Sequence, residues 1–475
     1  MGRWIDDWDP DDEAFWARTG RRIARRNLIL SIFAEHLGFA IWVLWSVVVI
    51  NLGNAGLSMS LAETFWLTAA PNLIGAALRI PYTFAVPRFG GRLWTTISAT
   101  LLLIPATLLA VVVPSGWLAH QPHGTQFWVL LACAATAGVG GGNFSSSMAN
   151  ISFFYPERRK GLALGLNAAG GNLGVAVVQL VVPLVIIVGV PAAAAKLPRH
   201  EVHLAYAGLV WLPLIVVAAL CAWLFMNSIT DARGDARSYV SSLRHGQTWI
   251  MSILYIGTFG SFIGYSFALP LVIRSTFPEF LAANPFIATY LAGLGFLGAL
   301  IGSVARPFGG WLSDRFGGAR VTLGCFLGMG AFTATAIVGV KSHSFPVFFG
   351  SYLAIFLLAG AGNGSTYRMI PVIFGALGRK ELADTGGDER ATMLAYKREA
   401  AAVIGIAGAI GAFGGFLIQV AFRQASLGAA GTDWATPALR VFLVAYAVFA
   451  FLTWFCYLRR SFAIARVPSL AHAGV

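Results

Sequence analysis

Twelve apolar stretches place the strongest constraint on this chain, because each is long enough to cross a bilayer as a helix. They cover residues 28–50, 64–84, 94–114, 127–153, 161–190, 204–228, 249–273, 287–310, 321–341, 346–374, 399–422 and 438–458. About 20 helical residues cross the roughly 30 Å of hydrocarbon in a membrane. Only 11% of the residues are charged, whereas a soluble domain has about 25%. The sequence therefore predicts an all-α membrane protein with twelve transmembrane helices.

The net charge of +13 follows from topology rather than from a nucleic-acid site. Most of the 33 Lys and Arg residues lie in the loops on one side of the twelve spans. Loops rich in Lys and Arg remain in the cytoplasm, so both termini are expected to be cytoplasmic in a multi-pass protein of the cell (inner) membrane. The lipid bilayer is the expected environment, and no nucleic acid is an expected partner.

A charged loop divides the chain into two six-helix halves. The expected parts are a cytoplasmic lead (1–27), an N-terminal bundle (28–228), a linker (229–248), a C-terminal bundle (249–458) and a cytoplasmic tail (459–475). The lead contains Trp8 and Trp16, and we interpret it as an interfacial helix anchored in the membrane by tryptophans. Parallel six-helix repeats with a site at their interface are a transporter architecture.

An arginine recurs at the same place in both halves. Arg79 and Arg306 each lie in an apolar span, and the spacing from each to a following Arg-Phe-Gly-Gly sequence is identical. A guanidinium in hydrocarbon is costly and does not shed its proton. The matched pair therefore predicts an anion bound between the halves. The alternative is that each side chain extends to the cytoplasmic edge of the membrane.

Other polar residues lie inside the spans. Asn143 and Asn363 occupy equivalent positions in two glycine-rich spans, where they would contact a substrate or bond across helices. Arg368 would contact the cavity or extend to the surface. The four cysteines are widely spaced, and the sequence contains no metal-binding His cluster or nucleophile motif. We expect no metal, no cofactor and no enzymatic activity.

Glu35 and His36 are two titratable residues well inside the first span. Titratable groups in a helix bundle mark proton relays. Alternatively, Glu35 faces cytoplasmic water or pairs with an arginine such as Arg79.

Two motifs carry a resemblance to a known family. Residues 140–156 read GGGNFSSSMANISFFYP, and residues 361–367 read AGNGSTY. They resemble the first and second signatures of the nitrate/nitrite porters, a branch of the major facilitator superfamily. Residues 164–174 and 254–264 are also similar to the family. The resemblance covers nearly the whole chain and implies the major facilitator fold.

The resemblance implies roles for individual residues. Arg79 and Arg306 match the substrate-binding arginines, Phe144 and Phe259 match an aromatic pair that sandwiches the flat anion, and Asn172 and Tyr255 match polar groups that line the site. The loops after the second and eighth spans match interdomain latches of the superfamily; they hold Arg88, Arg92, Asp314, Arg315 and Arg320. Alternatively, the positive charges in these loops only fix the membrane topology.

The resulting hypothesis is a secondary active transporter for nitrate and nitrite that works by alternating access and is monomeric. The Glu-His pair is similar to the family's proton-coupled branch, so we favour nitrate uptake coupled to protons. Electroneutral nitrate/nitrite antiport is the alternative. An anion channel and a non-transporting anion sensor are alternatives of other classes.

Overall fold

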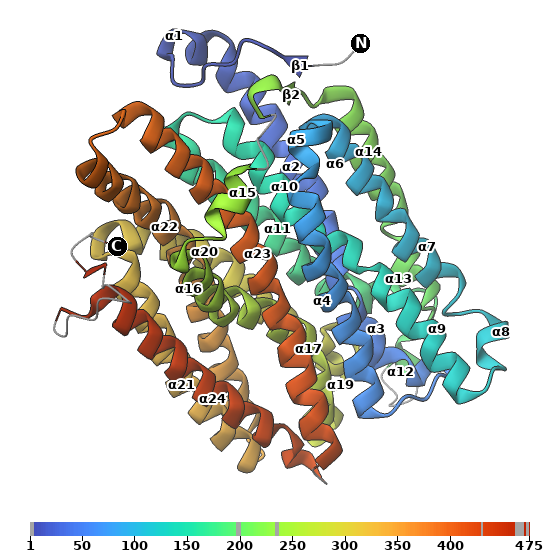
Figure 1. Ribbon diagram of the computed structural model, residues 1–475. Helices are drawn as coiled ribbons and strands as arrows, with labels where there is room; N and C mark the ends of the chain where they lie inside the picture. The colour runs from blue at the N-terminus through green and yellow to red at the C-terminus, as the bar shows by residue number, and fades with distance from the viewer. Residues whose placement is uncertain (1–3, 196–200, 233–236, 429–430, 461–469, 472–474) are drawn as a thin grey trace.

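The computed structural model describes residues 4–195, 201–232, 237–428, 431–460, 470, 471 and 475. Figure 1 shows a bundle of long helices that run between two ends. We call the end that carries the N-terminal strand β1 (Trp4–Ile5) and helix α1 (Glu13–Phe15) the lead end, and the other the opposite end. Successive long helices alternate in direction between the two.

The N-terminal half makes six passes. They consist of α2 (Arg21–Val43) with α3 (Trp45–Val48), α4 (Leu61–Thr83) with α5 (Ala85–Phe89), α6 (Gly91–Leu101) with α7 (Leu103–Val111), α9 (His123–Thr136) with α10 (Gly138–Phe154), α11 (Glu157–Val185), and α13 (Ala205–Leu209) with α14 (Leu212–Phe225). The short helices α8 (Gly116–Ala119) and α12 (Ala192–Ala195) lie at the opposite end.

The C-terminal half follows strand β2 (Ser228–Ile229) and α15 (Arg237–Ser242). Its helices are α16 (Gly246–Tyr255) with α17 (Ser261–Thr276), α18 (Pro278–Ala283), α19 (Pro285–Tyr290), α20 (Gly295–Phe316), α21 (Gly318–Lys341), α22 (Phe345–Thr385), α23 (Glu389–Gly428) and α24 (Thr436–Thr453). The halves meet where α4 packs on α23 and where α11 packs on α20.

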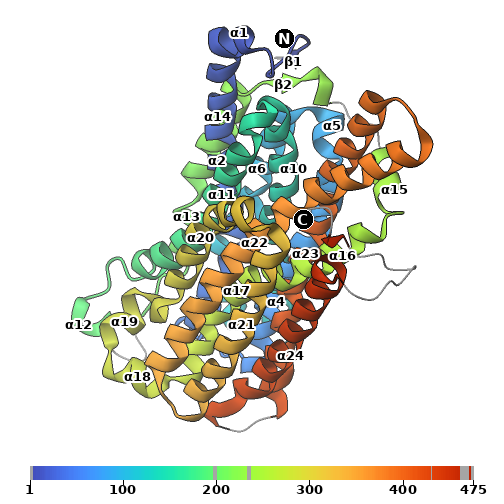
Figure 2. The same ribbon diagram turned by 90° about the vertical axis from the view of Figure 1, so that its left-hand side faces the viewer.

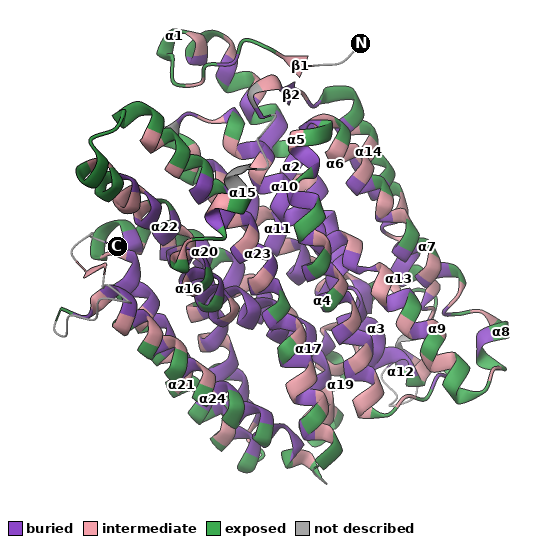
Figure 3. Ribbon diagram, viewed as in Figure 1, coloured by how far each residue is buried: buried purple, intermediate pink, exposed green. Residues whose placement is uncertain are grey.

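Eleven helical segments of the described chain are long and apolar enough to cross a membrane. Helix α4 is too polar for that set but lies within the bundle and completes the twelve expected passes. Helices α22 and α23 continue beyond the expected spans 346–374 and 399–422 at the lead end. Hydropathy detects only the apolar part of such helices, whereas the polar turns continue the same backbone. Figure 3 shows buried residues concentrated along the centre of the bundle.

The two Gly-Gly pairs end equivalent helices in the same way. The first glycine of each pair, Gly90 and Gly317, has a positive φ of 79° and 87°, a conformation in which glycine lacks the steric penalty of other residues. A Cβ on Gly91 would lie 1.8 Å from Asn150, and one on Gly318 would lie 2.4 Å from Met369. The repeat seen in the sequence therefore encodes two tight turns into α6 and α21.

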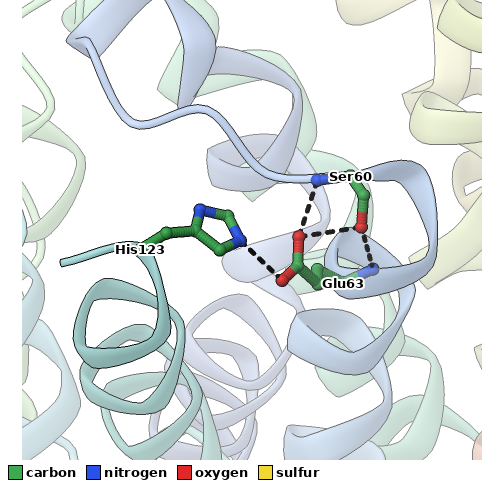
Figure 4. A network of polar contacts seen from close by, with 3 residues as sticks. All are labelled: Ser60, Glu63 and His123. Carbon is green, nitrogen blue, oxygen red and sulfur yellow. Dashed lines mark hydrogen bonds and ion pairs between the residues drawn. The ribbon is translucent and has the colours of Figure 1, made fainter.

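Helix α4 begins at the opposite end of the bundle with a capping box. The Ser60 backbone N–H donates to the Glu63 carboxylate at 2.8 Å, and the Glu63 backbone N–H donates to the Ser60 hydroxyl at 3.3 Å. His123 Nε2 lies 2.8 Å from the same carboxylate and ties the start of α9 to α4 (Figure 4). This sequence pattern fixes a helix N-terminus because it satisfies two otherwise unpaired amides.

The N-terminal lead packs on protein, which corrects its interpretation as a helix anchored in the membrane by tryptophans. Strand β1 pairs in parallel with β2. Trp8 and Trp16 are buried in a hydrophobic cluster with Phe154 at the end of α10, and Trp8 Nε1 donates to Phe153 O at 3.0 Å. Both indole rings are thus buried against protein at the end of α10, so they are unavailable to the bilayer.

Replacing Trp8 with Ala should destabilise the protein. Trp8 is 7% exposed, and removing a buried aromatic side chain costs about 3–5 kcal/mol. We expect a lower thermal unfolding midpoint in detergent for Trp8→Ala. Trp117→Ala is the matched control, because Trp117 is 57% exposed on α8. Equal effects of the two substitutions would contradict a stabilising role for the packing of Trp8 in the lead.

Candidate anion-binding site between the two bundles

Arg79 lies on α4 and is fully buried. Its Nε donates to Gly141 O of α10 at 2.9 Å, and its Nη1 donates to Gly408 O of α23 at 2.8 Å. Since α23 belongs to the C-terminal half, this guanidinium links the two bundles through backbone carbonyls.

Arg306 occupies the equivalent place on α20 and is 3% exposed. Its Nη2 donates to the hydroxyl of Tyr255 at 3.2 Å. Tyr255 ends α16 and precedes a π-helical turn over Ile256–Gly260, a type of distortion frequent at functional sites. Neither arginine reaches the surface, so the alternative in which both extend to the membrane edge does not describe this structure.

Two aromatic rings lie against the arginines. Phe144 of α10 and Phe259 of the π-helical turn stack with centroids 5.8 Å apart and 22° between their planes. The Cζ atom of Arg79 lies 4.8 Å from the Phe144 centroid and 4.7 Å from that of Phe259. Arg306 Cζ lies 5.2 Å from the Phe144 centroid. Phe144 thus contacts both guanidinium groups, an arrangement worth about 2 kcal/mol when desolvated.

The rings are too close for an anion to lie between them. A flat ion held between two parallel rings needs about 7 Å between the ring planes, since each contact takes about 3.5 Å. The observed 5.8 Å between centroids is shorter. The sandwich implied by the resemblance therefore requires Phe144 and Phe259 to move apart.

Several buried polar atoms at the interface lack a hydrogen-bond partner among the described residues. They include one guanidinium nitrogen of each arginine, Arg79 Nη2 and Arg306 Nη1. In the described part of the chain neither arginine pairs with a carboxylate. An unsatisfied buried donor costs about 1–3 kcal/mol, and more when charged. Two free cationic donors from opposite halves fit a ligand that is an anion with several acceptor oxygens.

The three asparagines are buried but do not join this cluster. Asn172 and Asn363 leave both amide atoms unpaired, and Asn143 leaves its Oδ1 unpaired. Asn143 packs against Gly38 of α2, where a Cβ would lie 3.0 Å from its Nδ2. Among the described contacts, none joins these amides to the arginines or to the Phe144–Phe259 pair. Their role at a substrate stays a prediction.

Tyr367 of α22 is a site residue to which the sequence analysis assigned no role. Its ring lies 5.2 Å from Arg306 Cζ and packs edge-on against Phe144 at 6.2 Å. Its hydroxyl is buried without a partner in the described structure. Tyr367 ends the second family motif, so the sequence did point to this region. The sequence gives no reason to prefer Tyr367 over its neighbours in the motif.

Glu35 lies beside the arginines without bonding to them. It is 1% exposed on α2. Its carboxylate accepts hydrogen bonds from Ser147 of α10 and from Asn167 of α11, the latter at 2.7 Å, and its Oε1 has no described partner. Both arginines are near enough to interact with it electrostatically. Glu35 therefore neither faces water nor pairs with Arg79.

His36 has a different partner from Glu35. Its Nδ1 lies 3.0 Å from Gly170 O on α11. Glu35 also lies against α11, at Asn167 and Gly171, but no described hydrogen bond joins it to His36. The structure does not combine Glu35 and His36 into one pair.

The sequence profile described as Major Facilitator Superfamily matches residues 27–419. The nitrate/nitrite transporter NarU of Escherichia coli (strain K12) is 40% identical over 96% of this chain and 97% of its own length. The chain belongs to the major facilitator superfamily. Its resemblance to the nitrate/nitrite porters is confirmed, as is its expected nature as a membrane transporter rather than an enzyme.

Other relatives agree with this assignment. A probable nitrate/nitrite antiporter, NarK2 of Thermus thermophilus, is 37% identical over 97% of both chains. The fold of this superfamily member is similar to that of the xylose transporter XylE from E. coli in a partially occluded inward-open conformation. The TM-score is 0.62 at 15% identity, covering 91% of this chain and 99% of XylE. The expected twelve-helix, two-bundle fold is confirmed.

The predicted latch residues of this porter make contacts within their own halves. Arg92 Nε donates to Trp223 O at 2.7 Å, and Asp314 pairs with Arg368 at 2.6 Å. Arg88 lies over Phe89 and Arg315 over Trp311. Arg320 is exposed. Arg368 is also exposed, and it pairs with Asp314 in the last turn of α20 rather than entering the central cavity.

Two buried glutamines hold the halves of the porter together toward the opposite end. Gln419 of α23 donates to Gly264 O at 2.7 Å and accepts from Thr68 of α4 at 2.9 Å. Gln179 of α11 donates to Ser266 O of α17 at 2.6 Å and to Ser46 Oγ at 3.1 Å. Each glutamine thus makes one hydrogen bond that crosses between the bundles, Gln419 with Thr68 and Gln179 with Ser266 O. These bonds join the two halves toward the opposite end.

Replacing Gln419 with Leu should loosen this contact between the halves. The variant loses the cross-bundle bond to Thr68 and the bond to Gly264 O within the C-terminal half. Both groups become less well satisfied, at about 1–3 kcal/mol for a buried group. Hydrogen–deuterium exchange should become faster in the opposite-end turns of α4 and α23. Gln424→Leu on the exposed side of α23 is the control, and an equal response of both variants would rule out a role for Gln419 in joining the halves.

Proposed function

We propose that this chain is a secondary active transporter that carries nitrate and nitrite by alternating access. The observation that carries the proposal is the pair of buried arginines, one from each half, which share the ring of Phe144 and each keep an unpaired guanidinium nitrogen. The names of NarU and of the Thermus antiporter support the substrate class.

The chemistry of the substrate matches this donor set. Nitrate is flat, monovalent, weakly hydrated and unprotonated at physiological pH. A planar guanidinium can donate two parallel hydrogen bonds to such an ion, and the positive edges of aromatic rings tolerate its diffuse charge. Arg79 and Arg306 would hold the anion, Phe144 and Phe259 would flank it, and Tyr255 with the buried asparagines would line the site.

Alternating access would move the two halves as units around this site. The proposed moving parts are residues 28–228 and 249–458, joined by the linker 229–248. The bond from Arg79 to Gly408 O couples the halves. An anion that takes over this guanidinium would release α23 from α4, so binding and rearrangement are linked through a single side chain.

We place the lead end on the cytoplasmic side of a cell (inner) membrane, because the excess of Lys and Arg lies on that side. The lead 1–27 and the tail 459–475 are then cytoplasmic. The expected working unit is a monomer, since one chain supplies both arginines of the site.

Uptake of nitrate against an inside-negative potential needs a compensating flow. Each charge moved costs about 2.3 kcal/mol per 100 mV, so either nitrite leaves in exchange or at least two protons enter with each nitrate. Glu35 favours proton coupling, because it is a buried carboxylate with a free oxygen beside two cations. The name of the Thermus relative favours exchange.

Replacing Arg79 or Arg306 with Lys should reduce nitrate flux in proteoliposomes at least about tenfold. Lysine keeps the charge but loses the planar pair of donors, and a hydrogen bond to a charged group is worth about 1.5–3 kcal/mol. Arg440→Lys, at an exposed position on α24, is the control. Flux near the wild-type level in both site variants would show that these arginines do not bind the substrate.

Glu35→Gln distinguishes the two coupling modes. If Glu35 carries protons, the variant should lose the stimulation of nitrate uptake by an acid-outside pH gradient while it still exchanges nitrate for nitrite. Glu279→Gln, at an exposed position of α18, should behave as wild type. Wild-type uptake that ignores the gradient and requires internal nitrite would defeat proton coupling and establish antiport.

A further inference from the structure

A cavity of about 480 Å³ lies at the lead end, on the outside of the N-terminal bundle. One wall carries four arginines from the first turns of α2, and the rest of the lining is apolar; the residues are Ala17, Arg21, Arg22, Arg25, Arg26, Ile29, Leu30 and Phe225. Figure 2 shows α2 and α14 next to each other below α1 at this end. The cavity is separate from the site between the bundles and has no part in the proposed transport.

The lining changes from charged to apolar along the helix axis. Arg25 is followed one turn later by Ile29, and Arg26 by Leu30, a shift of about 6 Å at 1.5 Å per residue. Ile29 is 53% exposed and Phe225, at the end of α14, is 48% exposed. The order from charged to apolar follows that of a lipid, in which the phosphate lies at the interface and the acyl chains lie deeper.

The charge of this wall is not balanced by the residues that line the cavity. Among them there is no carboxylate. The nearby Glu13 of α1 pairs with Arg158 of α11 instead. Arg26 donates to Asn227 Oδ1 at 2.6 Å, which fixes its position. Positive charge that only sets topology needs neither a cavity nor an apolar floor beneath the arginines.

We propose that this cavity binds an anionic phospholipid from the leaflet that faces the lead end. The phosphate would accept charge-assisted hydrogen bonds from Arg21, Arg22 and Arg25, and an acyl chain would lie on Ile29, Leu30 and Phe225. Basic pockets at the edges of transmembrane helices recognise anionic headgroups in this way. The complementary charge and the exposed apolar floor together select a lipid over a soluble anion.

The test uses the purified full-length protein in a neutral detergent, with phosphatidylglycerol and phosphatidylcholine as probes and native mass spectrometry as the measurement. Wild-type protein should retain phosphatidylglycerol at least about tenfold better than phosphatidylcholine. The R21Q/R22Q/R25Q/R26Q variant should lose this preference. The R379Q/K380Q/R390Q/R398Q variant should keep it, because it removes the same charge from exposed positions of α22 and α23.

Two further arms keep the proposal falsifiable. Phe225→Ala leaves all four arginines in place and should still weaken phosphatidylglycerol retention several-fold, which covers the case in which the quadruple variant does not fold. Inorganic phosphate at millimolar concentration should not displace the lipid. Equal retention by the two quadruple variants, an unchanged Phe225→Ala protein, or displacement by phosphate alone would each overturn a lipid site here.

Discussion

The structure depends on keeping two guanidinium groups buried without a bonded carboxylate. Arg79 and Arg306 remain charged in any environment, so the protein must solvate them itself. It does so with backbone carbonyls at Gly141 and Gly408, with the Tyr255 hydroxyl, and with the ring of Phe144. These partners leave one nitrogen of each arginine unpaired. The site is thus stable enough to fold and still favours an incoming anion.

The solvation of Arg79 also joins the two halves. Its Nη1 bonds across the interface to α23, while Gln179 and Gln419 make cross-bundle hydrogen bonds closer to the opposite end. Glycines allow close helix packing within each half: a Cβ on Gly140 would lie 2.1 Å from Gly38 O, and one on Gly360 would lie 2.1 Å from Gly302 O. Close packing brings the backbone carbonyls to the side chains that need them.

The lead end has a different organisation. There the N-terminal residues, the turn after α10 and strand β2 form a small cluster around Trp8 and Trp16, outside the path between the bundles. The arginines of α2 lie just below this cluster. Because the cluster fixes the first turns of α2 against the rest of the N-terminal half, the basic wall and the apolar floor formed by Ile29 and Phe225 keep a defined geometry.

The sequence by itself determined the membrane class, the two-half organisation and the paired arginines, because hydropathy, repeat spacing and the price of a charge in hydrocarbon are local properties. Only the tertiary structure decided what those residues touch. In the structure Phe144 stacks on Phe259, and His36 has a different partner from Glu35. Arg368 lies at the surface, and Tyr367 lies against Arg306 in the site. The structure also buries the two lead tryptophans in protein rather than lipid. A side chain's partners depend on helix rotation and on packing between distant segments, and neither is encoded in the apolar pattern of one span.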